Sequence, residues 1–401
     1  MIKPPIDTPA RETATGTVLH IVKVTGIAGA ENHLLTLLPG LQAHGVPISV
    51  LLLTEPNRPM DNYAGRLIAA GIPTRQWPIR GNLDSLLVTR LTRLFHAEQP
   101  RAVHTHLIHA DWHGIIAARR AGIKSIFMTS HNDDPFRRWL VIRLIQRWMW
   151  SRVTAGITIS DALRRFAISV EGAPADRITT IHYGLDPATA SAGDGARTMI
   201  RHELGISPQA VVFGSVCRLI PQKGIDTALR AFWQVAQQLP EAQYIVVGDG
   251  SERAGLEAQA AQYRLSHRMH FLGWRDDARA LMSALDVFVM PSRWEGFGLV
   301  ALEAMAARLP VIATNVSALP EIVQQNQTGL LVPPDDVPAL AEAMLTAASQ
   351  PDTIRLMGMA GRQRLETNFT ADRMIARTAA VYQAGGVPVQ GDARNGVPLK
   401  V

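Results

Sequence analysis

Cysteine is nearly absent from this chain of 401 residues, in which Cys217 is the only one. A single cysteine excludes an intramolecular disulfide and a zinc site built from several thiolates, and it is typical of a reducing compartment. Long hydrophobic runs are missing too, since no uncharged apolar stretch approaches the roughly 20 residues that span a bilayer. The first residues, MIKPPIDTPARETATG, lack the apolar core of a secretory signal. We therefore expect a cytoplasmic protein that does not cross the membrane.

Acidic residues are the minority charge, with 34 Asp and Glu against 40 Lys and Arg and a formal net charge of +6. This balance favours an anionic partner, and phosphates, nucleic acid and an acidic membrane surface all qualify. The apolar fraction of 47% and the charged fraction of 18% are typical of a globular protein. Because the chain is longer than one hydrophobic core usually supports, two domains of roughly 180–200 residues are expected.

Short β-branched and apolar runs alternate with longer segments of helical periodicity along most of the chain. This alternation predicts an α/β fold with parallel sheets that helices cover on both faces. Helices are expected at Glu31–Leu41, Thr227–Gln238 and Ala339–Ala348. The predicted strands are Val18–Val24, Ile48–Leu53, Ala102–Thr105, Ser125–Thr129, Thr154–Ile159, Val211–Val216, Tyr244–Val247, Asp286–Met290 and Val311–Ala313.

The alternation is interrupted over residues 187–208, where small and flexible residues precede a short helical segment. We therefore predict an N-terminal Rossmann-like domain at 1–190 and a C-terminal one at 191–370. A last helix, 371–384, is expected to return to the N-terminal domain. The aperiodic tail 385–401 is expected to be frayed.

The segment Asp286–Ala306, DVFVMPSRWEGFGLVALEAMA, combines a strand, a turn-rich loop and a helix that begins near Gly298. Ligands of open α/β sheets bind at the carboxyl ends of strands, where this loop would lie. Glu295 in the loop and Glu303 in the helix offer acceptor-only groups that suit a hydroxyl-rich ligand. Gly296 and Gly298 permit a close approach of the backbone to that ligand. In isolation, the same two carboxylates are more often a solvated loop residue and a partner of the helix dipole.

Two further strand ends carry matching features. Arg218 and Lys223 follow the strand in SVCRLIPQKGID, and two cations there suit a pyrophosphate, which an arginine can bind bidentately. Gly248 and Gly250 flank Asp249 after the strand in YIVVGDGS, which is ordinary turn chemistry that also leaves room for a ligand. A basic residue that stands alone in a loop is commonly solvated. The prediction of a ligand site therefore rests on the combination of these loops.

In this order and spacing, the motifs CRLIPQKGID, VVGDGSE, FLGW and PSRWEGFGLVALEAMA resemble the retaining glycosyltransferases of family 4, also called glycosyl transferases group 1. The likeness covers most of the chain and is strongest from about Val211 to Pro333. It implies the GT-B fold, in which two Rossmann-like domains with parallel sheets face a central cleft. It also implies a UDP- or GDP-linked nucleotide sugar as co-substrate, with no cofactor and no metal required.

The resemblance implies a role for each of these residues. Arg218 and Lys223 would hold the donor pyrophosphate, and Glu303 would accept hydrogen bonds from the ribose hydroxyls. Glu295 would hold hydroxyls of the transferred sugar together with the amides around Phe297 and Gly298. The expected catalytic residues are Glu295, Arg218, Lys223 and His131, and the expected donor-binding residues are Glu303, Gly296, Phe297, Gly298, Gly29, Gly248 and Gly273.

The N-terminal domain resembles the family less closely. The loop Thr25–Glu31, TGIAGAE, leads into a helix whose free amides and dipole suit a phosphate. Family members often carry a Gly-Gly pair where this chain has Ala28 and Gly29, and a tight turn without a ligand is the alternative. His131 matches the family histidine beside the transferred sugar, with a surface histidine as the alternative. Gly273 would lie near the nucleotide base.

Histidines cluster in VHTHLIHADWH, where His104 and His106 would share one face of a strand. Such a pair invites a metal interpretation. The metallohydrolase pattern is not met, however, because Ile108 and the late Asp111 interrupt it. We therefore expect histidines of the core or of the cleft wall, and no metal site.

The segment PFRRWLVIRLIQRWMWSR, residues 135–152, contains five arginines, three tryptophans and no acid. Its helical periodicity gives one apolar stripe and an opposite basic face. The stripe comprises Val141, Leu144, Ile145 and Trp148, and the basic face comprises Arg143 and Arg147. Such a helix suits the surface of an anionic membrane leaflet, and it suits equally a helix packed on its own domain with a solvated basic face.

These features predict a retaining transferase that moves a hexosyl-type sugar to a hydroxyl of a glycan, lipid-linked or small-molecule acceptor, in bacterial polysaccharide or glycolipid biosynthesis. Its place would be the cytoplasm, including the inner face of the membrane. Two other classes stay open: an epimerase or phosphorylase of the same architecture, and a non-enzymatic basic protein that binds nucleic acid. Nucleic acid is not expected as a partner, because no recognised binding module is present.

Overall fold

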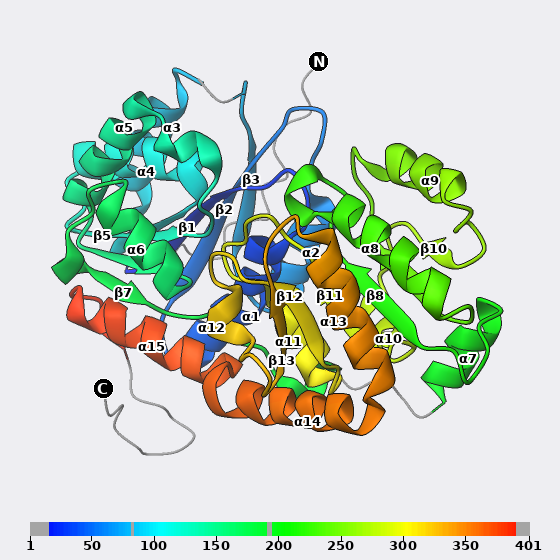
Figure 1. The fold of residues 1–401 in the computed structure, drawn as a ribbon. Coiled ribbons are helices and arrows are strands. Elements are labelled where there is room, and N and C mark those ends of the chain that lie inside the picture. Colours follow the sequence, from blue (N-terminus) through cyan, green and yellow to red (C-terminus); the bar gives the residue numbers. More distant parts are fainter. Residues whose placement is uncertain (1–15, 82–83, 191–194, 390–401) are drawn as a thin grey trace. The chain divides into compact units, whose positions relative to one another are not determined.

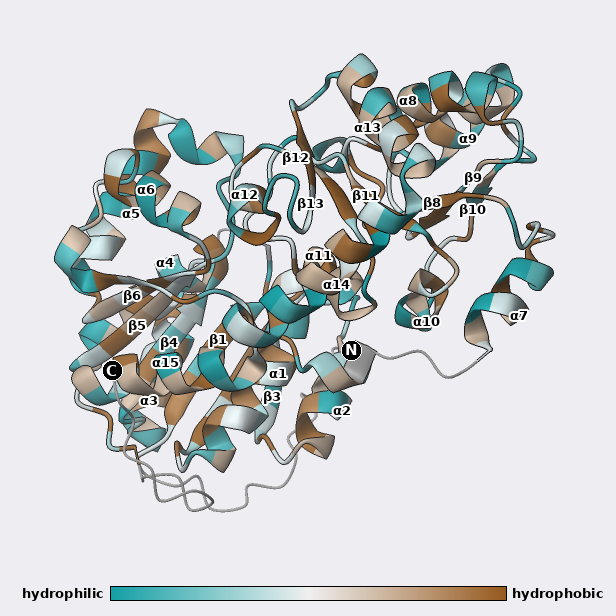
Figure 2. Ribbon diagram, turned by 60° about the horizontal axis from the view of Figure 1, so that its bottom comes forward, coloured by the Kyte–Doolittle hydropathy of each residue, from teal (hydrophilic) through white to brown (hydrophobic). Residues whose placement is uncertain are grey.

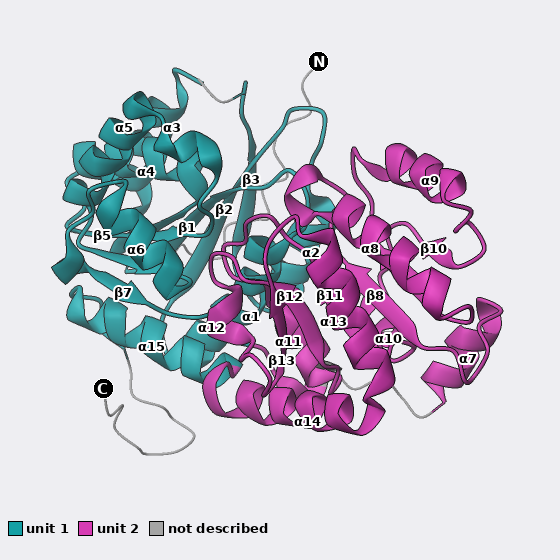
Figure 3. Ribbon diagram, in the orientation of Figure 1, with its two compact units in different colours: residues 1–184, 371–401 teal, residues 185–370 magenta. Residues whose placement is uncertain are grey.

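The chain folds into two compact units, which Figure 3 distinguishes by colour. The computed structural model describes residues 16–81, 84–190 and 195–389. Unit 1 consists of Met1–Gly184 and Ala371–Val401, and unit 2 consists of Leu185–Thr370. The sequence placed the domain boundary at residue 190, whereas the change of unit occurs at Gly184. The last helix of the described chain, Ala371–Ala384, is part of unit 1 (Figure 3).

Unit 1 contains a seven-stranded parallel sheet in the order β3-β2-β1-β4-β5-β6-β7 (Figure 1). The strands are β1 Val18–Lys23, β2 Ile48–Thr54, β3 Thr74–Pro78, β4 Ala102–His106, β5 Ser125–Ser130, β6 Ala155–Thr158 and β7 Ile178–Thr180. The α-helices are α1 Gly29–Ala43, α2 Asp61–Ala69, α3 Leu87–Glu98, α4 Leu107–Arg120, α5 Leu140–Arg152, α6 Asp161–Ser169 and α15 Ala371–Ala384. Two 3₁₀ helices, η1 Pro135–Arg138 and η2 Ala175–Arg177, join them.

Both faces of this sheet are buried, which explains why β1 and β2 read as mostly apolar runs. In β1, Val18 and Val22 join a core that includes residues of α1 and α15. Leu19 and Ile21, which point to the opposite face, join a second core with α3 and α4. The polar residue His20 lies between Val18 and Val22 on the α15 side and is fully buried.

Unit 2 contains a six-stranded parallel sheet in the order β10-β9-β8-β11-β12-β13. The strands are β8 Val212–Val216, β9 Gln243–Val247, β10 Met269–Phe271, β11 Val287–Met290, β12 Val311–Thr314 and β13 Gly329–Val332. The helices are η3 Pro187–Ala190, α7 Ala196–Glu203, η4 Pro221–Lys223, α8 Ile225–Gln238, α9 Arg253–Gln262, α10 Ala278–Met282, α11 Leu299–Ala306, α12 Leu319–Ile322, α13 Val337–Ser349 and α14 Pro351–Asn368. In Figure 2 the inner strands of this unit are largely hydrophobic, whereas α8 is hydrophobic on one side and hydrophilic on the other.

The α/β class with parallel sheets is confirmed, and every predicted strand is present. Four strands were missed, β3, β7, β10 and β13, and these are the two edges of each sheet. The last helix ends at Ala384 as predicted, but the residues directly after it are not frayed. Val387 is buried, and the carbonyl of Gly386 accepts hydrogen bonds from Arg101, so the chain is held beyond residue 384. Most of the predicted tail, 390–401, lies outside the described residues.

Candidate functional site

The loops that follow β8 and β11 meet at the carboxyl-end edge of the unit 2 sheet. The two strands are hydrogen-bonded neighbours, so their ends lie side by side. Gly224 in the first loop has φ +63°, and a Cβ there would lie 2.1 Å from the carbonyl oxygen of Pro291 in the second. This contact requires glycine, because any side chain at that position would push the two loops apart.

An ion pair joins these two loops. Lys223 Nζ donates to Glu295 Oε2 at 2.5 Å, and the two side chains are 14% and 12% exposed. Ser292 Oγ lies 3.4 Å from the same carboxylate oxygen. The predicted cation and the predicted sugar-binding carboxylate are therefore in direct contact at the strand ends. Partial burial strengthens the field of both charges relative to water.

Arg293 links the loop after β11 to η4, to the first turn of α8 and to the turn before α13. Its guanidinium donates to Asp226 at 2.8 Å, to Asp335 at 2.9 Å and to the carbonyl of Pro221 at 2.5 Å. The hydrogen bond to Asp226 is the main reason that the pKa of Arg293 is raised. In addition, Gln222 donates to the carbonyl of Trp294 at 3.0 Å. Sequence reasoning missed this clamp, because a single arginine in a loop gives no sign of its partners.

Glu303 lies in the second turn of α11 and is held by a residue that sequence reasoning also missed. Arg279, on α10, donates to Glu303 Oε1 from Nε at 3.1 Å and from a terminal nitrogen at 3.0 Å. The helix begins after Gly298, whose φ of +106° is a conformation that other residues rarely adopt. The Glu303 carboxylate thus keeps a fixed orientation at this edge of the sheet.

The loops after β9 and β10 pack against the loop after β8. A Cβ at Gly248 would lie 1.8 Å from the carbonyl oxygen of Cys217, and the φ of Gly248 is +130°. Gly248 donates its N–H to the carbonyl of Gly273 at 2.8 Å. Burial raises the pKa of the Cys217 thiol to about 12, so this cysteine is not a thiolate nucleophile at neutral pH.

The remaining residues predicted in unit 2 divide into exposed and buried ones. Arg218 is exposed, and its guanidinium has no hydrogen-bond partner among the described residues. The Phe297 side chain is 1% exposed and packs edge-on against Phe369, so only the backbone of Phe297 is available to a ligand. Gly296 is buried beside it. A small cavity of about 10 Å³ lies next to Lys223 and Ser292 and has room for one water molecule.

In unit 1, Gly29 begins α1 and is exposed, with open space around the position of a Cβ. The N–H of Ala28 is already bonded to Glu31 Oε2 at 2.9 Å. A carboxylate therefore satisfies one of the free donors at this helix N-terminus.

His131 follows β5 and is buried, and both of its ring nitrogens have partners. Nε2 lies 3.0 Å from His106 Nδ1, and Nδ1 lies 2.5 Å from the Tyr183 hydroxyl. Burial, assisted by the positive charge of Arg137, lowers the pKa of His131 to about 3. His104 and His106 are fully buried, so the expectation of core histidines is confirmed for both.

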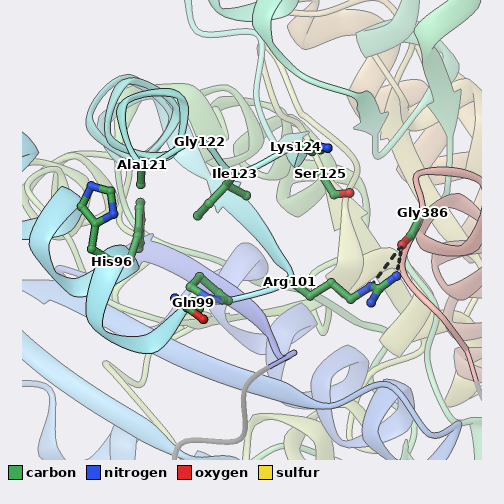
Figure 4. Close-up of a pocket in the computed structure, with 11 residues that line it drawn as sticks. His96, Gln99, Arg101, Ala121, Gly122, Ile123, Lys124, Ser125 and Gly386 are labelled. Atoms are coloured by element: carbon green, nitrogen blue, oxygen red, sulfur yellow. Dashed lines mark hydrogen bonds between the residues drawn. The ribbon is translucent and has the colours of Figure 1, made fainter.

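A cavity of about 590 Å³ lies elsewhere in unit 1, before the amino ends of β4 and β5 (Figure 4). Gln99, Arg101, Lys124 and Ser125 line it, and Figure 4 shows the Arg101 guanidinium turned toward the carbonyl of Gly386. It contains none of the predicted site residues. Ligands of such sheets bind at the opposite, carboxyl-end edge.

The helix α5 is only partly packed on unit 1. Trp139 and Leu140 are each 68% exposed, and Val141 and Leu144 are exposed as well. The C-terminal half is anchored, because Trp150 is buried and donates to Glu171 at 2.8 Å. The predicted apolar stripe therefore faces solvent in its first half. No helix among the described residues is long and apolar enough to cross a membrane.

Comparison with known proteins gives consistent matches over both units. Residues 196–364 match the family described as glycosyl transferases group 1, and residues 27–189 match glycosyltransferase family 4. The chain is 29% identical over 300 residues to a glycogen synthase of Mycobacterium tuberculosis, which covers 71% of this chain and 69% of that protein. It is 25% identical over 342 residues to the UDP-Gal:alpha-D-GlcNAc-diphosphoundecaprenol alpha-1,3-galactosyltransferase of Escherichia coli, covering 82% and 88%. The crystal structure of Anabaena Alr3699/HepE in complex with UDP-glucose is similar in fold, with a TM-score of 0.81 at 22% identity over 92% and 99% of the two chains.

Proposed function

The chain belongs to the group 1 and family 4 glycosyltransferases of the GT-B type, and from this membership we propose that it is a retaining hexosyltransferase with a nucleotide-sugar donor. The observation that carries the proposal is the contact between Lys223 and Glu295 at the carboxyl-end edge of the unit 2 sheet. The Lys223 ammonium is suited to a phosphate oxygen, and the Glu295 carboxylate is suited to sugar hydroxyls.

Arg218 and Lys223 would bind the donor diphosphate. Arg218 is exposed and has a guanidinium that suits two phosphate oxygens. A diphosphate beside Lys223 gives its ammonium a second anion, which leaves Glu295 able to accept hydrogen bonds from the sugar. As the bond between sugar C1 and the phosphate oxygen breaks, the negative charge on the departing diphosphate grows, and fixed cations stabilise it most in the transition state.

Glu303 would bind the ribose of the donor. Its carboxylate can accept two hydroxyl hydrogen bonds in addition to those from Arg279, since an ionised carboxylate has about four acceptor positions. The glycines at 248, 273 and 298 would allow the donor to approach the backbone of the surrounding loops.

Retention of the anomeric configuration would follow from attack on the same face as the leaving group. The acceptor hydroxyl oxygen forms the new bond to C1, the bond to the phosphate oxygen breaks, and the hydroxyl proton passes to the departing diphosphate. This route needs no covalent intermediate, no cofactor and no metal. Unit 1 would bind the acceptor. Of its residues, Gly29 would contact the donor and His131 would lie beside the transferred sugar, as the resemblance to the family implies.

The acceptor would be a glycan or a lipid-linked sugar in polysaccharide or glycolipid biosynthesis. The names of two relatives, a glycogen synthase and a transferase to diphosphoundecaprenol, support these two classes. We favour the lipid-linked class, because Trp139 and the first residues of α5, Leu140 and Val141, are exposed close in sequence to the exposed Arg138 and Arg143. Apolar and basic side chains on one helix suit the surface of an anionic bilayer.

A panel of nucleotide sugars tests the proposal. We expect one donor to raise the melting temperature and to be consumed only when an acceptor is added, giving a product whose anomeric proton signal keeps the donor configuration. Conversion of the donor sugar without an acceptor would show an epimerase instead. Inversion of configuration, or salt-sensitive binding of nucleic acid without binding of any nucleotide sugar, would contradict the proposal.

A further inference from the structure

A continuous chain of hydrogen bonds runs through the core of unit 1, and the function proposed above uses only one of its members. It links side chains of β1, β4 and β5, of the segments after β5 and β7, and of α15. In order, its members are Tyr183, His131, His106, His20, Tyr382, His104 and Thr129, and the six contacts measure 2.5, 3.0, 2.9, 3.1, 2.6 and 2.7 Å. We call this set the histidine relay.

The strand register explains how the relay forms. His20 on β1 is paired with His104 on β4, and His104 and His106 lie two residues apart, so all three point to one face of the sheet. That face is covered by α15, whose Tyr382 lies in the same core as Val18, Val22 and Phe127. One contact of the relay joins His20 to Tyr382, which lie 362 residues apart in the sequence.

The four imidazoles are neutral. Burial lowers the pKa of His20 and of His131 to about 3 and holds the pKa values of His104 and His106 well below the usual range. Among the described residues, no carboxylate is hydrogen-bonded to any of these rings. In addition to burial, the nearby Arg137 guanidinium disfavours a positive charge on the His131 ring.

A neutral imidazole has one N–H donor and one acceptor nitrogen, so it must donate on one side and accept on the other. If Tyr183 donates to His131 Nδ1, then His131, His106 and His20 each donate from Nε2. If His131 donates to Tyr183 instead, each of the three donates from Nδ1. Because Tyr382 has a single hydroxyl proton, it donates to His104 when it accepts from His20, and it accepts from His104 when it donates to His20. The relay therefore has two arrangements, and in each of them all four histidines share one tautomer.

We propose that the histidine relay fixes the tautomer and ring orientation of His131, and that Tyr382, His20 and His106 are positioning residues that act on sugar transfer through it. This inference rests on the proposed function, which puts His131 beside the transferred sugar. Both ring nitrogens of His131 form hydrogen bonds within the relay. A reversal of the donor and acceptor roles of Tyr382 therefore also reverses the direction of the hydrogen bond between His131 and Tyr183. A helix from the end of the chain is thereby coupled to a strand end of the N-terminal sheet.

A competing use of the same residues is metal binding. One ring nitrogen each of His20, His104 and His106 lies within 4.8 Å of the others, a spacing that a metal ion could bridge. Those rings already satisfy one another and Tyr382 through contacts of 2.6 to 3.1 Å, and a metal would have to replace these hydrogen bonds. The structure therefore favours the relay over a metal site, and the test below includes a measurement of bound zinc.

Long-range ¹H–¹⁵N spectra of the histidine side chains in the full-length protein test the proposal without any activity assay. We expect His20, His104, His106 and His131 to be neutral at neutral pH and to show one common tautomer. Different fixed tautomers among His20, His106 and His131, or one zinc ion per chain retained through gel filtration, would overturn it. These outcomes are independent of whether the chain transfers sugar at all, so they do not depend on the proposed function.

Tyr382→Phe tests the coupling, with Tyr63→Phe as the matched control. Both remove one buried hydroxyl from the same core of unit 1, but the Tyr63 hydroxyl donates to the carbonyl of Glu31, outside the relay. We expect Tyr382→Phe to change the His131 spectrum and to lower kcat about tenfold, the effect of one hydrogen bond, with an unchanged KM for the donor. Tyr63→Phe should change neither. An unaltered His131 spectrum and kcat in Tyr382→Phe would overturn the coupling.

Discussion

Arg279 and Glu303 form an ion pair between two helices, and two nitrogens of the arginine bind one oxygen of the carboxylate at 3.1 and 3.0 Å. The arginine is on α10 and the glutamate on α11, so the pair connects the elements on either side of β11. Glu303 is largely buried, with its side chain 14% exposed, whereas that of Arg279 is 44% exposed. Both contacts are made to one oxygen, Oε1, so the second carboxylate oxygen is not bonded to the arginine.

Arg279→Ala should weaken donor binding without slowing the chemical step. Loss of the pair frees the Glu303 side chain, and we expect the KM for the donor to rise about tenfold with kcat nearly unchanged, as for a lost charged hydrogen bond. The measurement is steady-state kinetics with the normal donor and with its 2′-deoxyribose analogue. Since Glu303 is proposed to bind the ribose, the variant should also lose discrimination between the two. Unchanged discrimination would contradict the ribose assignment.

Lys223→Ala and Glu295→Ala should each reduce kcat/KM by about 100-fold, the scale reported by removal of one electrostatic contact to a transition state. Because the two groups touch, their effects should not add, and the double variant should be little worse than either single one. Glu295→Gln keeps the shape and removes the charge, and it separates hydrogen bonding from electrostatics. Additive losses in the double variant would show that the residues act at different places.

Gly248→Ala should destabilise unit 2 by at least ~2 kcal/mol, because the new Cβ would overlap the carbonyl of Cys217 and the φ of +130° strains any other residue. Gly255→Ala is the matched control. Gly255 lies inside α9 with open space around its Cβ position, so alanine there should stabilise by up to about 1 kcal/mol. Urea unfolding of the two variants gives both values, and equal stabilities would refute the packing described for the β8 and β9 loops.

Trp139→Ser combined with Leu140→Ser should abolish binding to vesicles that contain phosphatidylglycerol and should leave sugar transfer to a soluble acceptor unchanged. Both side chains are exposed, so the folded chain should tolerate the change. Leu356→Ser, which alters an exposed leucine on α14, serves as the control. Co-sedimentation with and without the anionic lipid, at low and high salt, measures the effect. Equal binding of the variant and the original chain would place the membrane contact elsewhere or exclude it.

Acid should unfold unit 1 before unit 2. The pKa values of His20 and His131 are lowered by burial to about 3, and those of His33, His104 and His106 are also far below the usual range. Below about pH 6.5 the unfolded chain therefore binds more protons than the folded one, and stability falls by up to ~1.4 kcal/mol per pH unit for each of these residues.

Hydrogen exchange followed by mass spectrometry from about pH 7 to about pH 5 resolves the two units and checks this prediction. Unit 2 is the internal control, because its described histidines, His202, His267 and His270, are not fully buried. Protection that disappears from both units at the same pH would contradict the assignment of acid sensitivity to the buried histidines.

The central strands were predictable from the sequence because burial on both faces demands runs such as VLHIVK in β1. The edge strands were not. β10 has three residues, MHF, and β3 ends in proline, so neither has enough apolar residues to stand out from a loop. Their place in the sheet depends on pairing with a neighbour, which no local pattern encodes.

The loops of the candidate site were predictable as motifs but not as contacts. The residue types of Lys223 and Glu295 suggested a diphosphate and a sugar, whereas the ion pair between them depends on the alignment of β8 with β11. Arg279 and Arg293 look like ordinary surface arginines in the sequence, and only tertiary structure reveals the carboxylates they hold. Tyr382 could not be associated with His20 by any spacing rule.

The helix α15 completes the core of unit 1 although it is synthesised after the whole of unit 2. On the ribosome, the first 184 residues must wait for about 10–40 s at ordinary elongation rates before Met374, Ile375 and Tyr382 arrive. During that interval His20 and His104 have no phenol between them, and the apolar face that α15 later covers is open to water. Nascent chains stalled ahead of residue 371 should therefore be the form of this protein that most needs a chaperone.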